Sequence, residues 1–137
     1  MSNCDEQTIA RLRDAGLRPT RQRRDLANLL FTKCHEAVTA EGLHAFALRS
    51  GIKVSLATVY GTLHNFCTVG MMRDVSIDSR RYFDINPDNH QYFYFEDEKR
   101  LVGATEAETG IKSVPSPPHG QQVSRVDVVV RLKRDEP

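Results

Sequence analysis

The chain has 137 residues, of which 39% are hydrophobic and 27% charged, with no tryptophan. This composition supports a modest core and excludes wholesale disorder. No run approaches the roughly 20 apolar residues of a membrane span, and the first residues lack the pattern of a secretory signal. Three scattered cysteines without a CxxC pair disfavour a disulfide framework and fit reduced thiols. We therefore expect a cytoplasmic protein of one ordinary domain or two very small ones.

The net charge of +1 conceals an uneven distribution of charged residues. Residues 1–65 hold nine Lys and Arg against six Asp and Glu, whereas residues 66–137 hold ten against twelve. Residues 11–24 contain six arginines and one acid, Asp14. Clustered cations favour a polyanion such as nucleic acid, because binding to phosphates releases counterions. The alternative for such a cluster is a solvated helix face.

Four helices are predicted in the first 70 residues. Apolar residues recur at helical spacing in four segments, at residues 5–15, 21–32, 40–49 and 56–67. The last three segments each follow a residue suited to an N-cap: Thr20, Thr39 and Ser55. In the fourth segment the predicted buried stripe is Leu56, Val59, Leu63 and Phe66, and Thr62 is placed on the surface.

The periodicity then changes from helical to alternating. Two strands, at residues 71–77 and 80–85, are predicted around a turn at Asp78-Ser79. Helices followed by a β-hairpin form the element order of a winged helix. Further along, the pattern predicts strands at residues 91–95, near 101–102 and at 126–132, and a short helix around 104–109.

The predicted fold class is therefore α+β, with an N-terminal winged helix-turn-helix followed by a small α/β dimerisation domain. The expected boundaries are 1–86 for the DNA-binding domain and 87–137 for the second domain. A unit of about 50 residues rarely stabilises itself alone, and its strand edges favour pairing, so we expect a homodimer. Val129, on the otherwise polar face of the last strand, is the residue that a partner would cover.

The fourth helix has the side chains of a recognition helix. Such a helix needs small and hydrogen-bonding residues in its first turn so that its backbone can enter the major groove. Ser55 and Thr58 supply hydroxyl groups, Ala57 is small, and Tyr60 offers an aromatic edge for a thymine methyl. The alternative is an amphipathic core helix whose polar face meets only water.

Four motifs together resemble a known family. They are GLRPTRQR (16–23), VTAEGL (38–43), VSLATVYGTLHNF (54–66) and RRYFDI (80–85). Their letters, order and spacing are similar to those of the ferric uptake regulator (Fur) superfamily of dimeric winged-helix transcription regulators. The variants SLATVYGTLHNF and RYFDIN and the ending SRVDVVVRL most resemble the iron response regulator (Irr) branch of alphaproteobacteria, which regulates iron and haem metabolism.

The resemblance implies double-stranded DNA as a partner, in the form of an AT-rich inverted repeat. It places Arg18, Thr20 and Arg21 near the backbone or minor groove. It places four residues of the fourth helix at the major groove: Ser55, Ala57, Thr58 and Tyr60. Gly61 departs from the family pattern, because relatives usually carry a larger polar or basic residue there.

The resemblance also implies a regulatory site for a divalent metal (Fe, Mn or Zn) or for haem. Of the possible ligands, Asp84 and His90 match the family pattern best, and His35 lies near its N-terminal ligand. Further candidates with suitable donor atoms are Glu36, Glu106, Glu108 and His119. The histidine run of relatives reads Asn89-His90-Gln91-Tyr92 here, and haem would use His90 or Tyr92 as an axial ligand. The cysteine pairs of a structural zinc site are missing.

Two hypotheses about function stay open at this point. One is a DNA-binding repressor of iron or haem metabolism that responds to iron status. The other is a degenerate paralogue that binds DNA without metal sensing. An enzyme is not expected, because no HExxH, GxSxG, P-loop or paired-carboxylate motif is present.

Overall fold

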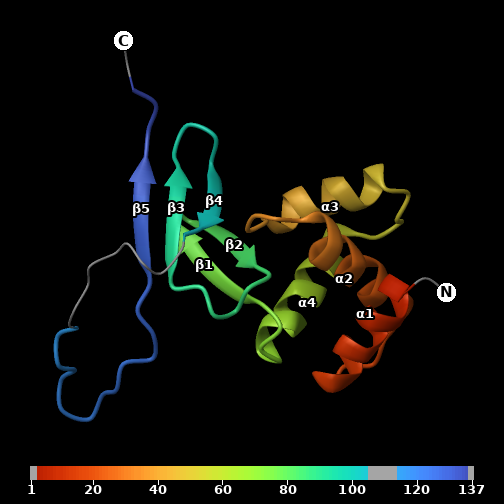
Figure 1. The fold of residues 1–137 in the computed structure, drawn as a ribbon, viewed down its shortest axis with the longest axis horizontal. Coiled ribbons are helices and arrows are strands. Elements are labelled where there is room, and N and C mark those ends of the chain that lie inside the picture. Colours follow the sequence, from red (N-terminus) through yellow and green to blue (C-terminus); the bar gives the residue numbers. More distant parts are fainter. Residues whose placement is uncertain (1–2, 105–113, 136–137) are drawn as a thin grey trace. The chain divides into compact units, whose positions relative to one another are not determined.

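The structure is a computed structural model that describes residues 3–104 and 114–135. It contains four helices followed by five strands (Figure 1). The helices are α1 (Asn3–Asp14), α2 (Arg21–Lys33), α3 (Ala40–Arg49) and α4 (Leu56–Thr68). The strands are β1 (Arg73–Ile77), β2 (Arg80–Asp84), β3 (Gln91–Phe95), β4 (Arg100–Gly103) and β5 (Val128–Leu132). The chain divides into two compact units between Pro87 and Asp88, whereas the sequence prediction puts the boundary after residue 86.

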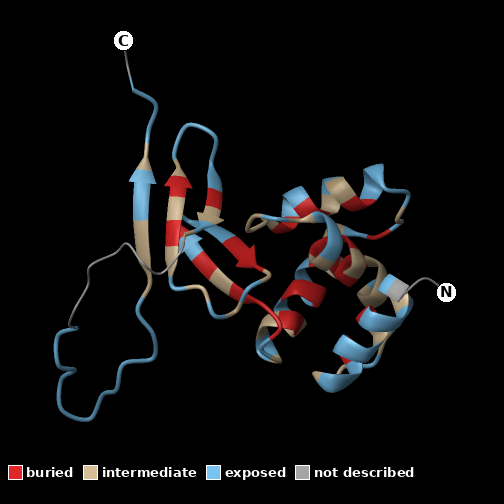
Figure 2. Cartoon of the chain, in the orientation of Figure 1, coloured by how far each residue is buried: buried red, intermediate tan, exposed pale blue. Residues whose placement is uncertain are grey.

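The helices of the first unit pack around one apolar core (Figure 2). Its fully buried side chains come from every helix and from the hairpin: Leu12, Leu26, Leu30, Leu43, Val59, Leu63, Phe66, Met72 and Phe83. Polar contacts join α1 to α2, because Asn28 accepts a hydrogen bond from Thr8 and donates one to Asp5. The guanidinium of Arg11 also lies over the Phe31 ring, 3.8 Å from its centroid.

All three predicted N-caps are confirmed. The side chains of Thr20, Thr39 and Ser55 each accept a hydrogen bond from the backbone N–H three residues further on. A residue with a short side-chain oxygen satisfies an N–H that the first helical turn leaves without a partner. The helix starts therefore follow from local sequence alone.

Two expectations about this unit are wrong. Thr62 is not on the surface but only 6% exposed, since it lies beside Thr20 and Arg23 at the start of α2. Met71 and Met72 do not begin the first strand. Gly70 has a φ of +80°, which turns the chain back so that Met71 N donates to Phe66 O, and both methionines join the helical core.

The β1–β2 hairpin completes the first unit as the wing. Its strands pair antiparallel from Arg73 opposite Asp84 to Ile77 opposite Arg80. Asp78 and Ser79 both have positive φ, as a two-residue type I′ turn requires. Val38, in the connection between α2 and α3, exchanges two backbone hydrogen bonds with Phe83 and so fixes the hairpin to the helices.

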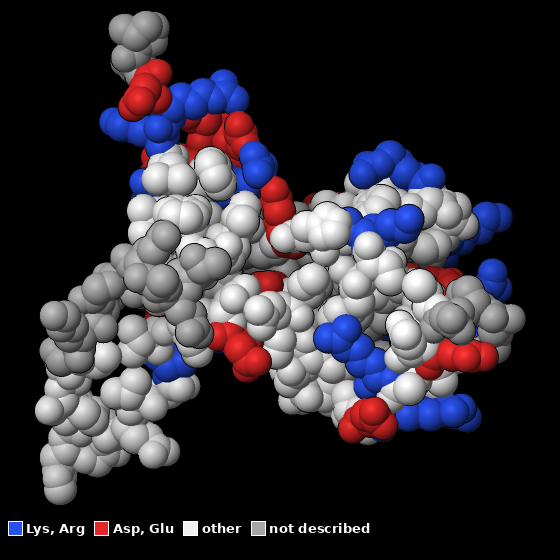
Figure 3. Space-filling view, viewed as in Figure 1, with Lys and Arg blue, Asp and Glu red and all other residues white. Residues whose placement is uncertain are grey.

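The second unit is a three-stranded sheet in the order β4-β3-β5. β3 runs antiparallel to β4 and parallel to β5. The predicted strand at 126–132 begins two residues later in the structure, and the predicted helix around 104–109 lies outside the described residues apart from Ala104. Ion pairs join the β3–β4 turn to the end of β5, where acidic and basic side chains gather in Figure 3: Arg131 with Glu96, and Arg134 with Glu98.

One face of this sheet is apolar and partly open. Tyr92 and Tyr94 of β3 are buried on one face, and Phe93 and Phe95 are half-buried on the other. Val130 lies opposite Phe93 and Val129 opposite Tyr92. Val129 is half-buried on the tyrosine face, which it shares with Arg131, whereas Val130 on the opposite face is 42% exposed. That a partner covers Val129 stays a prediction.

Among the described residues, no helix is long and apolar enough to cross a membrane.

Candidate nucleic-acid interface

α4 presents one face to the core and the other outward. Val59, Leu63 and Phe66 are fully buried, which fixes the rotation of the helix. Ser55, Ala57 and Tyr60 are consequently exposed on the opposite face, and Thr58 is half-buried. The structure thus brings the four predicted major-groove residues onto the outward side of one helix.

Ser55 and Thr58 use their hydroxyl groups within the helix. The Ser55 Oγ accepts from Thr58 N at 3.1 Å and donates to Thr58 Oγ1 at 2.9 Å. These two bonds fix the first turn of α4. A hydroxyl oxygen has two lone pairs, so Thr58 Oγ1 retains acceptor capacity and its own O–H donor.

Tyr60 is held by a residue of another helix. Its hydroxyl donates to Glu41 Oε1 at 2.5 Å, and Glu41 lies in the first turn of α3. The bond from Tyr60, followed by the backbone N–H of Glu41, lowers the pKa of the Glu41 carboxyl, and the same bond raises the pKa of Tyr60. Both residues line a hollow of about 490 Å³ that also involves Thr39 and the wing residues 79–81.

The start of α2 lies against α4. Thr20, the N-cap of α2, and Arg23 in its first turn line a hollow of about 340 Å³. Thr58, Gly61 and other residues of α4 line the same hollow. Gly61 leaves this space open, because a Cβ built there meets nothing within 4 Å. Of the predicted backbone-contacting residues, Thr20 is thereby placed next to a predicted major-groove residue.

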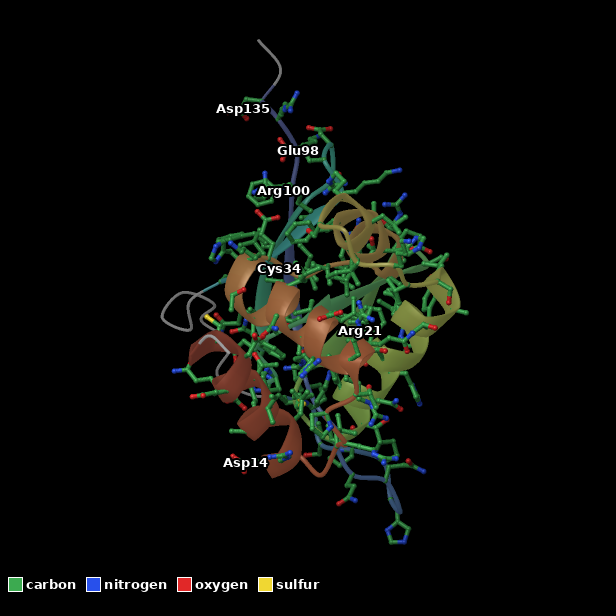
Figure 4. The ribbon with its side chains drawn as sticks, turned by 90° about the vertical axis from the view of Figure 1, so that its right-hand side faces the viewer. Asp14, Arg21, Cys34, Glu98, Arg100 and Asp135 are labelled. Carbon is green, nitrogen blue, oxygen red and sulfur yellow. The ribbon has the colours of Figure 1, made fainter. Side chains whose placement is uncertain are left out.

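Arg18 and Arg21 lie on either side of Thr20. Both are exposed, and the side chain of Arg21, at the start of α2 (Figure 4), is 88% exposed and 4.0 Å from Asp25. The Arg18 carbonyl accepts from Arg23 Nη1 at 3.0 Å. Arg21 and Lys53 line a further hollow of about 460 Å³, so cations from α2 and from the turn before α4 lie close together.

The predicted regulatory residues are in different parts of the chain. Asp84 is 5% exposed in β2 of the first unit, where its Oδ1 accepts from Asn86 N at 3.0 Å. His90 is exposed in the second unit and His35 is exposed between α2 and α3. In the part of the chain that the structure describes, no three His, Cys, Asp or Glu side chains are grouped as a metal site. Glu106 and Glu108 lie outside that part.

The residues around His90 have structural contacts. Tyr92 is 1% exposed and its hydroxyl donates to the Asn89 carbonyl at 3.3 Å. The Asn89 side chain lies so close to Gly103 that a Cβ there would be 2.5 Å from Asn89 Nδ2. The His90 carbonyl accepts from Val128 N. A buried tyrosine and a packed asparagine do not present ligands to an ion or to haem, so Tyr92 and Asn89 do not fit that role here.

Comparison with known proteins establishes the family. The model of the Ferric uptake regulator family matches residues 14–102, which span α2 to α4 and β1 to β3, together with the last residue of α1 and most of β4. The chain belongs to the ferric uptake regulator family.

A relative in this family is the peroxide-responsive repressor PerR of Staphylococcus aureus (strain Mu50 / ATCC 700699). It is 32% identical over 98 residues, which cover 71% of this chain and 66% of that protein. The chain thus matches slightly less than two thirds of the relative's length.

Solved structures show the same fold. The ferric uptake regulator of Pseudomonas aeruginosa with manganese has a TM-score of 0.70 at 20% identity, over 94% of this chain and 98% of that one. The Vibrio cholerae ferric uptake regulator has a TM-score of 0.71 at 19% identity, over 92% and 98%. These likenesses confirm the predicted fold class.

Sequence reasoning did not single out several residues that line the hollows of the candidate interface in this Fur-family chain. Glu41, Gln22 and Asn65 line its hollows, as do Arg80 and Arg81 of the wing. The two adjacent arginines beside the Asp78-Ser79 turn could have indicated these wing residues in the sequence, because a wing that flanks DNA needs cations near its tip. Nothing in the local sequence indicated Glu41, since its hydrogen-bond partner Tyr60 is 19 residues further along the chain.

Proposed function

We propose that this chain is a DNA-binding transcriptional repressor of iron or haem metabolism, related to the Irr branch, that acts as a homodimer. Each subunit places α4 in a major groove of an AT-rich inverted repeat. The β1–β2 wing flanks the backbone, and the arginines of residues 11–24 contact phosphates. The observation that carries the proposal is the outward face of α4 with Ser55, Ala57, Thr58 and Tyr60. Thr58 shares a hollow with the start of α2, and Tyr60 shares one with α3 and the wing.

The chemistry of this face supports direct readout of base pairs. Ala57 lets the backbone approach the base edges, Thr58 supplies a donor and an acceptor, and Tyr60 supplies an aromatic edge. The cations around it, Arg21, Lys53 and Arg80 among them, supply the salt-dependent part of the affinity.

The apolar face of the second unit supports the homodimer. Phe93 and Phe95 with Val128 and Val130 form a surface that one copy leaves partly exposed. A second copy of the same face would bury this surface, which stabilises the dimer by about 25 cal/mol per Å² of apolar surface removed from water. Such an isologous contact also matches the two-fold symmetry of an inverted repeat.

For the response to iron status, we propose Asp84 and His90, with His35, as the residues to test. Imidazole and carboxylate donors suit Fe, Mn or Zn, and an exposed His90 could serve as an axial ligand of haem.

The second candidate is a paralogue that binds DNA without sensing. It is favoured by the positions next to His90, where Tyr92 is a buried side chain and Asn89 packs against Gly103.

Fluorescence anisotropy on an AT-rich inverted-repeat duplex and on a scrambled duplex distinguishes the candidates. We expect preference for the inverted repeat and a change of affinity when Mn²⁺ or haemin replaces chelator. The same change should be absent in His90→Ala. A preference that no additive alters supports the paralogue, and equal binding of both duplexes contradicts both candidates.

A further inference from the structure

A carboxylate lies at the centre of the interface proposed for DNA. Glu41 is exposed, and it lines the same hollow as Tyr60, Arg80 and Arg81. A negative charge here is repelled by phosphates, so it lowers the affinity for any duplex. A position with such a cost should have a compensating role.

The contacts of Glu41 indicate that role. It accepts the Tyr60 hydroxyl bond at 2.5 Å, and this bond is the largest cause of its lowered pKa, with Arg80 contributing. The carboxylate is therefore ionised at neutral pH, and a charged acceptor makes a stronger hydrogen bond than a neutral one. Tyr60 is 41% exposed, and without this bond its side chain would be free to sample other rotamers.

The wing reinforces the arrangement. Arg81 Nε lies 2.8 Å from Asp74 Oδ2, which fixes Arg81 beside Tyr60, and Arg81 acts electrostatically on the Tyr60 hydroxyl. Arg80, next to it, lines the same hollow as Glu41 and acts electrostatically on its carboxyl group. This hydrogen bond joins α3 to α4, and the wing residues Arg80 and Arg81 line the same hollow.

We propose that Glu41 is a positioning residue that determines sequence specificity. It holds the Tyr60 ring in the orientation that contacts a base, and its charge weakens the sequence-independent part of the binding to any duplex. This inference rests on the proposed DNA-binding function. It adds Glu41 to the interface as the residue that positions Tyr60, while Tyr60 contacts the base.

The test uses the full chain, with affinities measured by anisotropy on an AT-rich inverted-repeat duplex and on a scrambled duplex of the same composition. The variants are Glu41→Ala, Glu41→Gln, Tyr60→Phe and the double variant Glu41→Ala/Tyr60→Phe. Glu6→Gln, which removes an exposed charge from α1, is the matched control for net charge.

The variants at Glu41 and Glu6 have distinct expected results. Glu41→Ala should lower the ratio of the two affinities about tenfold, because binding to the inverted repeat falls while binding to the scrambled duplex rises about two- to threefold. Glu41→Gln, whose amide oxygen still accepts from Tyr60, should recover most of the loss on the inverted repeat while keeping the gain on the scrambled duplex. Glu6→Gln should leave the ratio unchanged.

The double variant tests the coupling. If loss of the hydrogen bond causes the loss of affinity, the double variant Glu41→Ala/Tyr60→Phe should bind the inverted repeat no more weakly than whichever single variant binds it less tightly. Either change alone already removes the same interaction. A purely structural role of Glu41 would reduce thermal stability and leave the ratio unaltered.

The outcomes separate the two claims. If the wild-type protein prefers the inverted repeat and Glu41→Ala prefers it equally, or if the two losses add, the inference is overturned and the proposed function stands. If the wild-type protein binds both duplexes alike, the proposed function and the inference are overturned together.

Discussion

At the residue scale, Tyr60 is the side chain on which the proposed recognition of DNA by α4 depends most. The ring is exposed on the outward face of a helix whose inward face is fixed by Val59 and Leu63. In the proposed complex, a side chain held in this way contributes to base readout, whereas an arginine such as Arg21 contributes mainly to attraction of the DNA backbone.

We therefore predict that Tyr60→Ala weakens binding to the inverted repeat about ten- to a hundredfold and leaves binding to the scrambled duplex nearly unchanged. Arg21→Ala is the control, because loss of a phosphate contact should weaken both complexes and reduce their salt dependence. Anisotropy titrations at several salt concentrations provide the measurement. Equal losses on both duplexes in Tyr60→Ala would refute a base-contacting role.

Gly61 has no structural need to be glycine. It lies within α4, and a Cβ there meets nothing within 4 Å. We expect Gly61→Ala to raise the free energy of unfolding by about 0.5–1 kcal/mol, since alanine restricts the unfolded chain and favours helix. Urea unfolding followed by circular dichroism measures this change. A lower stability would mean that the helix is packed more tightly at this point than the structure shows.

At the scale of single elements, the starts of the helices are governed by local sequence. Thr20, Thr39 and Ser55 were predicted as N-caps because a cap needs only the residue and the N–H three positions on. Properties that depend on a neighbouring element were not predictable in this way. Thr62 is buried because α2 begins beside it, and Tyr60 meets Glu41 because α3 and α4 pack together.

Ser55 illustrates how one residue can serve a cap within the proposed interface. Ser55→Ala should lower the free energy of unfolding by about 1 kcal/mol, because Thr58 N loses its acceptor. Ser55→Asp keeps a cap acceptor and should retain most of the stability. Chemical denaturation of both variants tests this. Equal destabilisation by alanine and aspartate would show that the cap is not the origin of the effect.

At the scale of the whole molecule, the two units differ in what the sequence reveals. The order of the predicted elements indicated the winged helix and the motifs between residues 16 and 85 indicated the family, and the comparisons confirm both. The alternation of the last strand predicted an apolar face but not which valine stays open. That choice depends on β3, whose Tyr92 and Tyr94 are buried on the side of Val129.

The open face of the sheet leads to a prediction about assembly. Val130→Asp should raise the dimer dissociation constant at least about tenfold, because it would bury a charge opposite an apolar surface. Lys133→Asp, one residue beyond β5, adds an acidic residue away from that face and serves as the control. Sedimentation velocity over a range of concentrations gives the constants. An unaltered Val130→Asp dimer would place the interface elsewhere.

Selection of duplexes from a randomised pool by the full-length protein, followed by sequencing, tests most directly whether the chain reads DNA sequence through paired α4 helices. We predict enrichment of AT-rich sequences with two half-sites related by inversion, and loss of that enrichment in Tyr60→Ala. A selected pool without any enriched sequence would contradict the account.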